Sequence, residues 1–118
     1  MARILVIDDD LDVRATVGRM LQSAGHEVVL AANGMEGMEQ YRASPGDLVI
    51  TDIYMPGQEG LETIIGLRRR YPEIKIIAMS GKPAGGTMLS IARRLGALAI
   101  LQKPFSLEQL LQEVEKAL

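Results

Sequence analysis

Short apolar runs alternate with segments of helical periodicity along the whole chain, and this alternation limits the possible folds more than any other feature. The runs are rich in Ile, Val and Leu, as in strands that are buried on both faces of a sheet. Strands that alternate with helices form parallel sheets with right-handed crossovers. We therefore predict an α/β fold: a five-stranded parallel sheet in the flavodoxin-like order 2-1-3-4-5, with helices on both faces.

The expected elements follow from apolar spacing and from turn residues. The strands are predicted at Arg3 to Ile7, Glu27 to Ala31, Leu48 to Asp52, Ile74 to Met79 and Leu98 to Leu101. The helices are predicted from Leu11 to a stop at Gly25, from Gly34 to Ala43, from Gly60 to Arg70, from about Met88 to Leu95, and from Leu107 to Leu118. In the third helix, Leu61, Ile64 and Ile65 are expected to face the core. In the last helix, one apolar face is expected from Leu107, Leu110, Leu111, Val114 and Leu118. Ser106 and Gln109 have the spacing of a capping box.

Composition narrows the class of protein. The 118 residues suit a single domain, 1–118, and 47% of them are hydrophobic, which is typical of a globular chain. There is no Cys, so disulfides and thiolate metal sites are excluded. The net charge of −2 argues against direct binding of nucleic acid. We find no apolar run long enough for a membrane span and no signal peptide, and we expect a cytoplasmic protein.

Polar side chains gather where the predicted strands end. Asp8 and Asp9 end the first strand, Asp52 the third, Ser80 the fourth, and Lys103 follows the fifth. The carboxyl ends of parallel strands share one edge, and the first and third strands are neighbours in the predicted order. Clustered carboxylates need a cation between them, and all-oxygen ligation suits Mg²⁺. A carboxylate nucleophile, Mg²⁺, a lysine and a hydroxyl together suit a phosphoryl group.

Each of these residues also has an ordinary structural explanation. The acids from Asp8 to Asp10 could complement a helix dipole. Ser80 precedes a glycine and could be a turn residue, and Lys103 could be a solvated lysine before proline. Their occurrence together, at the ends of neighbouring strands, favours a site over separate structural roles.

Four motifs in order, VIDDD, VITDIYMPGQEG, IIAMSG and ILQKPF, span nearly the whole chain. In these motifs the chain resembles the response-regulator receiver domains of two-component signalling. The resemblance implies that Asp52 accepts a phosphoryl group from a sensor histidine kinase or a phosphotransfer protein. It also implies that Mg²⁺ is held by Asp8, Asp9, Asp52 and the backbone carbonyl of Tyr54.

The same resemblance assigns the remaining roles. Ser80 would be the hydroxyl that moves to the phosphoryl group, and Lys103 would contact the phosphoryl oxygens. The peptide between Lys103 and Pro104 is often cis in the family. The surface of the fourth helix, fifth strand and fifth helix would contact a fused or separate effector. Ile100 departs from the family pattern, because many receivers carry a Tyr or Phe at this position.

Two other functions share parts of this pattern. A binding module of the same fold that is never phosphorylated would fit the missing aromatic at Ile100. A phosphohydrolase with an aspartyl nucleophile would also use Mg²⁺, but such enzymes usually carry a second acid where this chain has Tyr54. For a receiver, no catalysis is expected beyond its own phosphorylation and dephosphorylation. The cognate kinase, the output and the oligomeric state are not encoded in any motif that we recognise.

Overall fold

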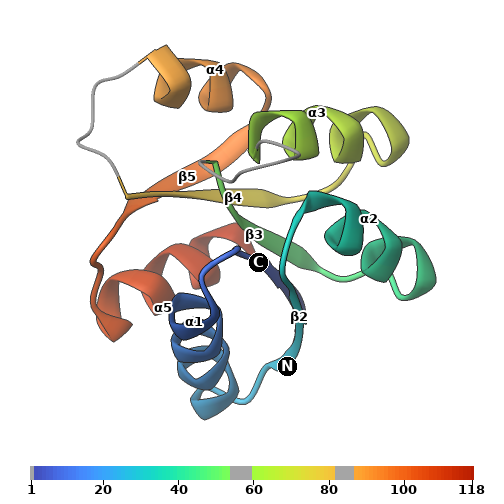
Figure 1. Ribbon diagram of the computed structural model, residues 1–118. Coiled ribbons are helices and arrows are strands. Elements are labelled where there is room, and N and C mark those ends of the chain that lie inside the picture. The colour runs from blue at the N-terminus through green and yellow to red at the C-terminus, as the bar shows by residue number, and fades with distance from the viewer. Residues whose placement is uncertain (1, 54–59, 82–86) are drawn as a thin grey trace.

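The computed structural model of the protein describes residues 2–53, 60–81 and 87–118, and its elements alternate strictly between strand and helix (Figure 1). The strands are β1 (Arg3–Ile7), β2 (Glu27–Ala31), β3 (Leu48–Asp52), β4 (Ile76–Ser80) and β5 (Ala97–Gln102). The helices are α1 (Leu11–Ser23), α2 (Gly34–Ala43), α3 (Gly60–Arg70), α4 (Thr87–Arg94) and α5 (Leu107–Ala117). None of the helices described is long and apolar enough to cross a membrane.

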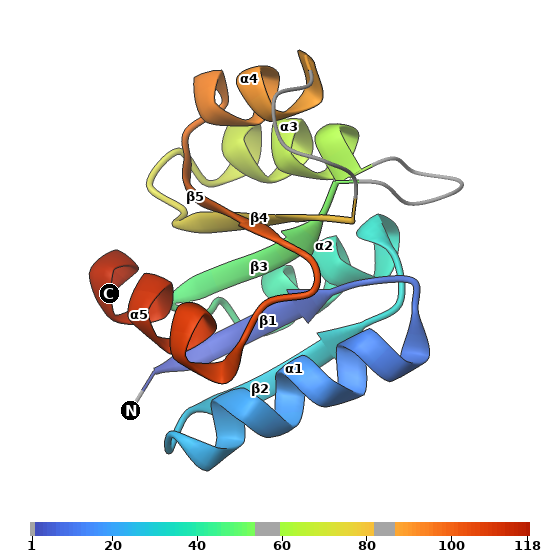
Figure 2. The same ribbon diagram turned by 90° about the vertical axis from the view of Figure 1, so that its left-hand side faces the viewer.

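All the strands lie in one parallel sheet with the order β2-β1-β3-β4-β5, which confirms the predicted topology. Helices α1 and α5 cover one face, and α2, α3 and α4 cover the other (Figure 2). Every strand therefore runs toward the same edge with its carboxyl end. Polar residues that follow the strands are brought to that edge, as the sequence predicts.

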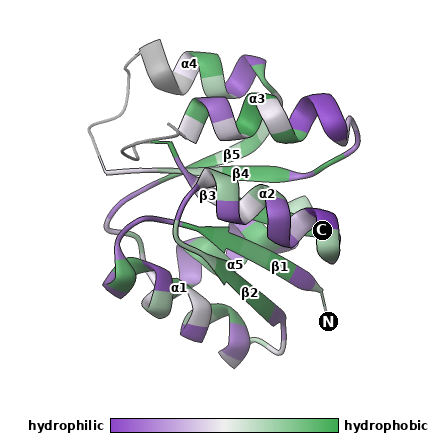
Figure 3. Ribbon diagram, turned by 45° about the vertical axis from the view of Figure 1, so that its right-hand side comes forward, coloured by the Kyte–Doolittle hydropathy of each residue, from purple (hydrophilic) through white to green (hydrophobic). Residues whose placement is uncertain are grey.

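The sheet separates two apolar cores, and alternate residues of β1, β3 and β4 face one core or the other. In β1, Ile4 and Val6 pack toward α1 and α5, whereas Leu5 and Ile7 pack toward α2 and α3. The strands are correspondingly apolar through the centre of the molecule (Figure 3). Burial on both faces fixes the register of β1 and β3, since a slip of one residue would exchange the two sets of side chains.

Apart from shifts of one or two residues at other element ends, three details differ from the sequence prediction. Strand β4 begins at Ile76 rather than at Ile74, because the Ile74 amide closes a turn onto the Tyr71 carbonyl. Ile65 is 36% exposed, and Leu67 is buried in its place, since it lies three residues beyond Ile64 on the inner stripe of α3. At the ends of α5, Leu107 and Leu118 are exposed, and the buried stripe is Leu110, Val114 and Ala117.

The helix starts nearest the acidic edge are fixed by side-chain caps. The Asp10 carboxylate accepts hydrogen bonds from the amides of Asp12 and Val13 at the start of α1. The predicted capping box of α5 is present: the Gln109 amide donates to Ser106 Oγ, and the Ser106 amide donates to Gln109 Oε1. These caps fix where α1 and α5 begin relative to the strand ends.

Arg68 joins the last turns of α3 and α4. Its guanidinium donates to the carbonyls of Leu95 (3.1 Å), Gly96 (3.2 Å), Pro72 (3.0 Å) and Ile74 (2.7 Å). The sequence predicts only that an arginine here complements the dipole of its own helix. In the structure, the Arg68 side chain donates to backbone carbonyls in the segments that follow α3 and α4, and so links these two segments.

Two tyrosines pack together in the core on the α2 side of the sheet, at the end away from the carboxyl edge. The rings of Tyr41 and Tyr71 have centroids 4.6 Å apart and are tilted by 59°. Burial raises the pKa of the Tyr41 hydroxyl, and the nearby Tyr71 and Asp47 raise it further. Tyr41 therefore stays neutral to a higher pH in the folded protein than an exposed tyrosine does.

Candidate functional site

Strands β1 and β3 bring three carboxylates together at the carboxyl edge of the sheet. Ile7 pairs with Thr51, so that Asp8 and Asp52 occupy the next positions on neighbouring strands. One carboxylate oxygen from each of Asp8, Asp9 and Asp52 lies within 4.8 Å of the others. Within residues 2–53, 60–81 and 87–118, this is the one group of three such ligands close enough to share a metal ion.

Asp8 is fully buried, and each of its polar groups is held. Its amide donates to the carbonyl of Ala31 (3.1 Å). Its Oδ1 accepts from the Asp10 amide (2.9 Å), and its Oδ2 accepts from Lys103 Nζ (2.8 Å). The orientation of the Asp8 carboxylate is therefore set before any ligand binds. The Asp9 carboxylate, in contrast, is exposed.

Lys103 Nζ bridges the two buried carboxylates, at 2.8 Å from Asp8 Oδ2 and 2.8 Å from Asp52 Oδ2. The Lys103 amide donates to the Ser80 carbonyl (2.7 Å), which attaches the lysine to the end of β4. The peptide before Pro104 is cis, as the family resemblance implies. Burial alone lowers the pKa of Lys103, but the hydrogen bonds that it donates to Asp52 and Asp8 outweigh burial and leave the pKa raised. The lysine therefore remains a cation.

The charges of the cluster do not balance. Three carboxylates and one ammonium group leave a net of two negative charges in a largely buried place. A divalent cation with a preference for oxygen ligands would neutralise them. The donor set contains no His or Cys, so it fits Mg²⁺ better than Zn²⁺ or copper.

Ser80 lies at the same edge on the next strand. It is 1% exposed, and Asp52 is 4% exposed. Asp52 pairs with Met79, so Ser80 is one position beyond the residue opposite the acid. The structure thus brings Asp8, Asp9, Asp52 and Lys103 into direct proximity and places Ser80 at the adjoining strand end.

Tyr54 and Ile100 were also singled out in the sequence. Tyr54, whose backbone carbonyl is an expected metal ligand, lies outside the described residues. Ile100 is half-buried in β5, pairs with Ala78 and packs against the core on the α4 side.

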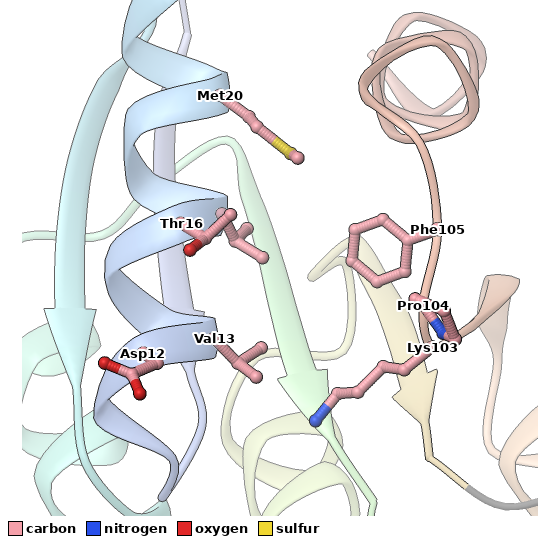
Figure 4. Close-up of a pocket in the computed structure, with 8 residues that line it drawn as sticks. Asp12, Val13, Thr16, Met20, Lys103, Pro104 and Phe105 are labelled. Carbon is pink, nitrogen blue, oxygen red and sulfur yellow. The ribbon is translucent and has the colours of Figure 1, made fainter.

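Two features near the site were not found from the sequence. Arg14 in α1 donates from Nη1 to the backbone carbonyl of Asp8 (2.8 Å). A largely apolar groove of about 250 Å³ also opens between α1 and the segment that carries Lys103 (Figure 4). Its lining includes Val13, Met20 and Phe105, and Lys103 Nζ extends from it toward the end of β3. The six-residue spacing of Asp8 and Arg14 could have indicated their contact, because α1 begins directly after the acids.

Comparison with known families gives a consistent match. The family model for the response regulator receiver domain matches residues 4–115. The DNA-binding transcriptional regulator NtrC of Azospirillum brasilense is 38% identical over 117 residues, which cover 99% of this chain and 24% of that protein. The chemotaxis protein CheY of Listeria monocytogenes is 30% identical over 118 residues, which cover 99% of this chain and 98% of CheY.

Solved structures show the same likeness. Chemotaxis protein CheY4 of Vibrio cholerae matches with a TM-score of 0.94 and 31% identity, covering 100% of this chain and 99% of CheY4. NtrX from Brucella abortus, solved in complex with ATP, matches with a TM-score of 0.92 and 30% identity, covering 98% of this chain and 26% of NtrX. The chain thus spans about a quarter of the length of the NtrC and NtrX relatives and nearly all of the CheY relatives.

Proposed function

The chain belongs to the response regulator receiver domain family, and from that premise we propose that it is a phosphoacceptor whose Asp52 takes a phosphoryl group in a two-component phosphorelay. The observation that carries the proposal is the bridge from Lys103 Nζ to Asp8 and Asp52, at 2.8 Å each. In this bridge, one cation contacts two buried carboxylates, which we take as the nucleophile and as a ligand of the metal. Receiver domains are signalling modules rather than enzymes with turnover on a separate substrate.

In the proposed reaction, an Asp52 carboxylate oxygen forms a bond to phosphorus while the bond from phosphorus to the donor breaks. With a sensor histidine kinase or a phosphotransfer protein as donor, the leaving group is a histidine imidazole, and the product is an acyl phosphate on Asp52. Mg²⁺, held by Asp8, Asp9 and Asp52 with the Tyr54 carbonyl, would neutralise charge on the phosphoryl oxygens. Asp52 is held in one orientation by Lys103, which lowers the cost of aligning it for attack.

Lys103 and Ser80 are proposed to act on the phosphorylated state. Lys103 already contacts Asp52 Oδ2, so its ammonium group is within reach of a phosphoryl group bonded to that side chain. The Ser80 hydroxyl, on the adjoining strand, would turn to the phosphoryl oxygens and carry the change toward α4. Because Ile100 stands in place of an aromatic residue, we expect a smaller change along β5 and α5 than in receivers that carry Tyr or Phe there.

The partner surface and the setting are part of the same proposal. The face of α4, β5 and α5 would contact a fused or separate effector, and residues 1–118 would act as one receiver domain in the cytoplasm. The names of the NtrC relatives describe DNA-binding transcriptional regulators. For this chain we propose no direct contact with nucleic acid, because its net charge is −2.

Intact-mass spectrometry after incubation with acetyl phosphate tests the proposal. We expect the mass of one phosphoryl group to be added in the presence of Mg²⁺, and no addition without Mg²⁺ or in Asp52→Asn. The absence of any addition in the wild-type chain would favour a binding module that is not phosphorylated. A rapid release of phosphate with repeated turnover would favour the phosphohydrolase.

A further inference from the structure

Asp9 differs from the other two acids of the cluster in how it is held. Asp8 is bonded to Lys103, Asp10 and Ala31, and Asp52 is bonded to Lys103. The Asp9 side chain is exposed, and within the described part of the chain it has no hydrogen bond or ion pair. Its place in the cluster must therefore come from the backbone on either side of it.

Each of the two peptide groups that flank Asp9 is fixed by a single side chain. The amide of Asp10, in the peptide group after Asp9, donates to Asp8 Oδ1 (2.9 Å). The carbonyl of Asp8, in the peptide group before Asp9, accepts from Arg14 Nη1 (2.8 Å). Together these two hydrogen bonds determine the direction in which the Asp9 side chain leaves the backbone.

The two hydrogen bonds differ in whether their acceptor group is also an expected metal ligand. The Asp8 carboxylate is itself an expected ligand, so the bond from the Asp10 amide shares its acceptor group with the metal. The Asp8 carbonyl accepts from Arg14 and is not part of the ligand set. Arg14 is half-buried on α1, and α1 is anchored by the Asp10 cap, so its guanidinium is supported independently of the metal.

We infer that Arg14 is a positioning residue for the metal ligand Asp9, acting through the Asp8 carbonyl. The inference rests on the proposed function, because it takes Mg²⁺ as the ion at this cluster. Residues that orient the ligands of a metal typically change its affinity by about 10- to 100-fold when they are removed. A charge-assisted hydrogen bond to a single backbone carbonyl belongs at the lower end of that range.

The sign of the effect separates positioning from simple electrostatics. Arg14 carries a positive charge beside an acidic cluster, so removing the charge alone should make Mg²⁺ bind more tightly. If the hydrogen bond to the Asp8 carbonyl positions Asp9, its removal should instead weaken Mg²⁺ binding. The two accounts predict opposite changes for one substitution.

NMR titration of the ¹⁵N-labelled chain with Mg²⁺ alone measures this affinity from the amide shifts of residues 8–10. We expect the Kd of Arg14→Met to be about tenfold higher than that of the wild type. If Arg14→Met folds poorly, Arg14→Gln takes its place. Glutamine lacks both the charge and the length of arginine, so the same rise in Kd is expected. Arg14→Lys keeps a donor group and the charge, and should recover most of the affinity. Arg19→Met is the matched control: Arg19 is exposed on the same helix, and among the described residues its side chain hydrogen-bonds Thr16 alone (3.5 Å), so the Kd should stay within about twofold.

A double-mutant cycle with Asp9→Ala completes the test. If Arg14 acts through Asp9, Arg14→Met should change the Kd by less than about twofold once Asp9 is absent. A tenfold loss that persists without Asp9 would overturn the inference, as would an unchanged or lower Kd in Arg14→Met. If the wild-type chain shows no Mg²⁺-dependent shift, the metal site of the proposed function fails and this inference fails with it.

Discussion

Replacing Lys103 with methionine removes the only cation that contacts the two buried carboxylates within the described residues. Lys103 Nζ lies 2.8 Å from each acid, and its side chain is only 19% exposed. At an effective dielectric constant of about 20, each contact is worth about 6 kcal/mol of attraction before the cost of desolvation. Oxygen atoms of Asp8 and Asp52 lie within 4.8 Å, so in Lys103→Met the two carboxylates would repel by at least about 3.5 kcal/mol.

The destabilisation of Lys103→Met follows from these two contacts. The repulsion between the two carboxylates sets the scale of the loss, since it is no longer offset by the ammonium group of Lys103. We therefore expect Lys103→Met to lower the free energy of unfolding by about 3–4 kcal/mol at pH 7 without metal. This agrees with the usual cost of breaking a buried ion pair, about 3–5 kcal/mol.

The response to Mg²⁺ follows from the same loss of positive charge. Mg²⁺ supplies the missing positive charge, so it should stabilise the variant more than the wild type at pH 7.

Urea unfolding at pH 7, with and without Mg²⁺, measures these differences. Lys116→Met is a matched control, because Lys116 makes an exposed ion pair with Glu113 (3.3 Å), and its loss should cost less than about 0.5 kcal/mol. If Lys103→Met costs no more than this control, the buried carboxylates do not depend on Lys103 and the electrostatic reasoning is wrong.

Three further predictions concern other parts of the fold. In Gly60→Ala, an added Cβ would lie 2.2 Å from the carbonyl oxygen of Asp52. The substitution should therefore lower the free energy of unfolding by about 2 kcal/mol or more, and it should slow phosphorylation by acetyl phosphate. Unchanged values of both would refute the contact. Arg68→Met should lower the free energy of unfolding in urea by about 2 kcal/mol, since four backbone carbonyls lose their donor, whereas the exposed Arg69→Met should stay within about 0.5 kcal/mol. Burial raises the pKa of Tyr41, so the neutral hydroxyl contributes to stability below pH 10, and this contribution is lost as the pH rises further. The free energy of unfolding of Tyr41→Phe should therefore depend less steeply on pH between pH 9.5 and 11.5. A slope identical to that of the wild type would contradict this.

The sheet order and the edge that carries the site were predictable because each signal is local. An apolar run ends at Asp8, Asp52 or Ser80, and the alternation of strands with helices then assigns all these ends to one edge. This step of the prediction requires no knowledge of contacts between distant residues. The family motifs add the roles of these residues, which remain proposals until the chemistry is measured.

The details that sequence reasoning missed depend on how the elements pack and on the direction in which a helix leaves its strand. The amphipathic pattern of α3 offers both Ile65 and Leu67 to the core, and only the packing of α3 on the sheet selects Leu67. Arg68 resembles any arginine at a helix end, yet its partners include Leu95, 27 positions along the chain. The contact of Arg14 with Asp8 depends on the exact direction of α1, which the Asp10 cap determines.

The central claim is that Asp52 is the residue that receives the phosphoryl group. Borohydride reduces an acyl phosphate on aspartate to homoserine, which marks the modified position permanently. After incubation with acetyl phosphate and Mg²⁺, followed by borohydride, tandem mass spectrometry should locate homoserine at position 52 and at no other acid. Homoserine at Asp8, Asp9 or elsewhere, or none in a chain that has gained the mass of a phosphoryl group, would contradict the assignment.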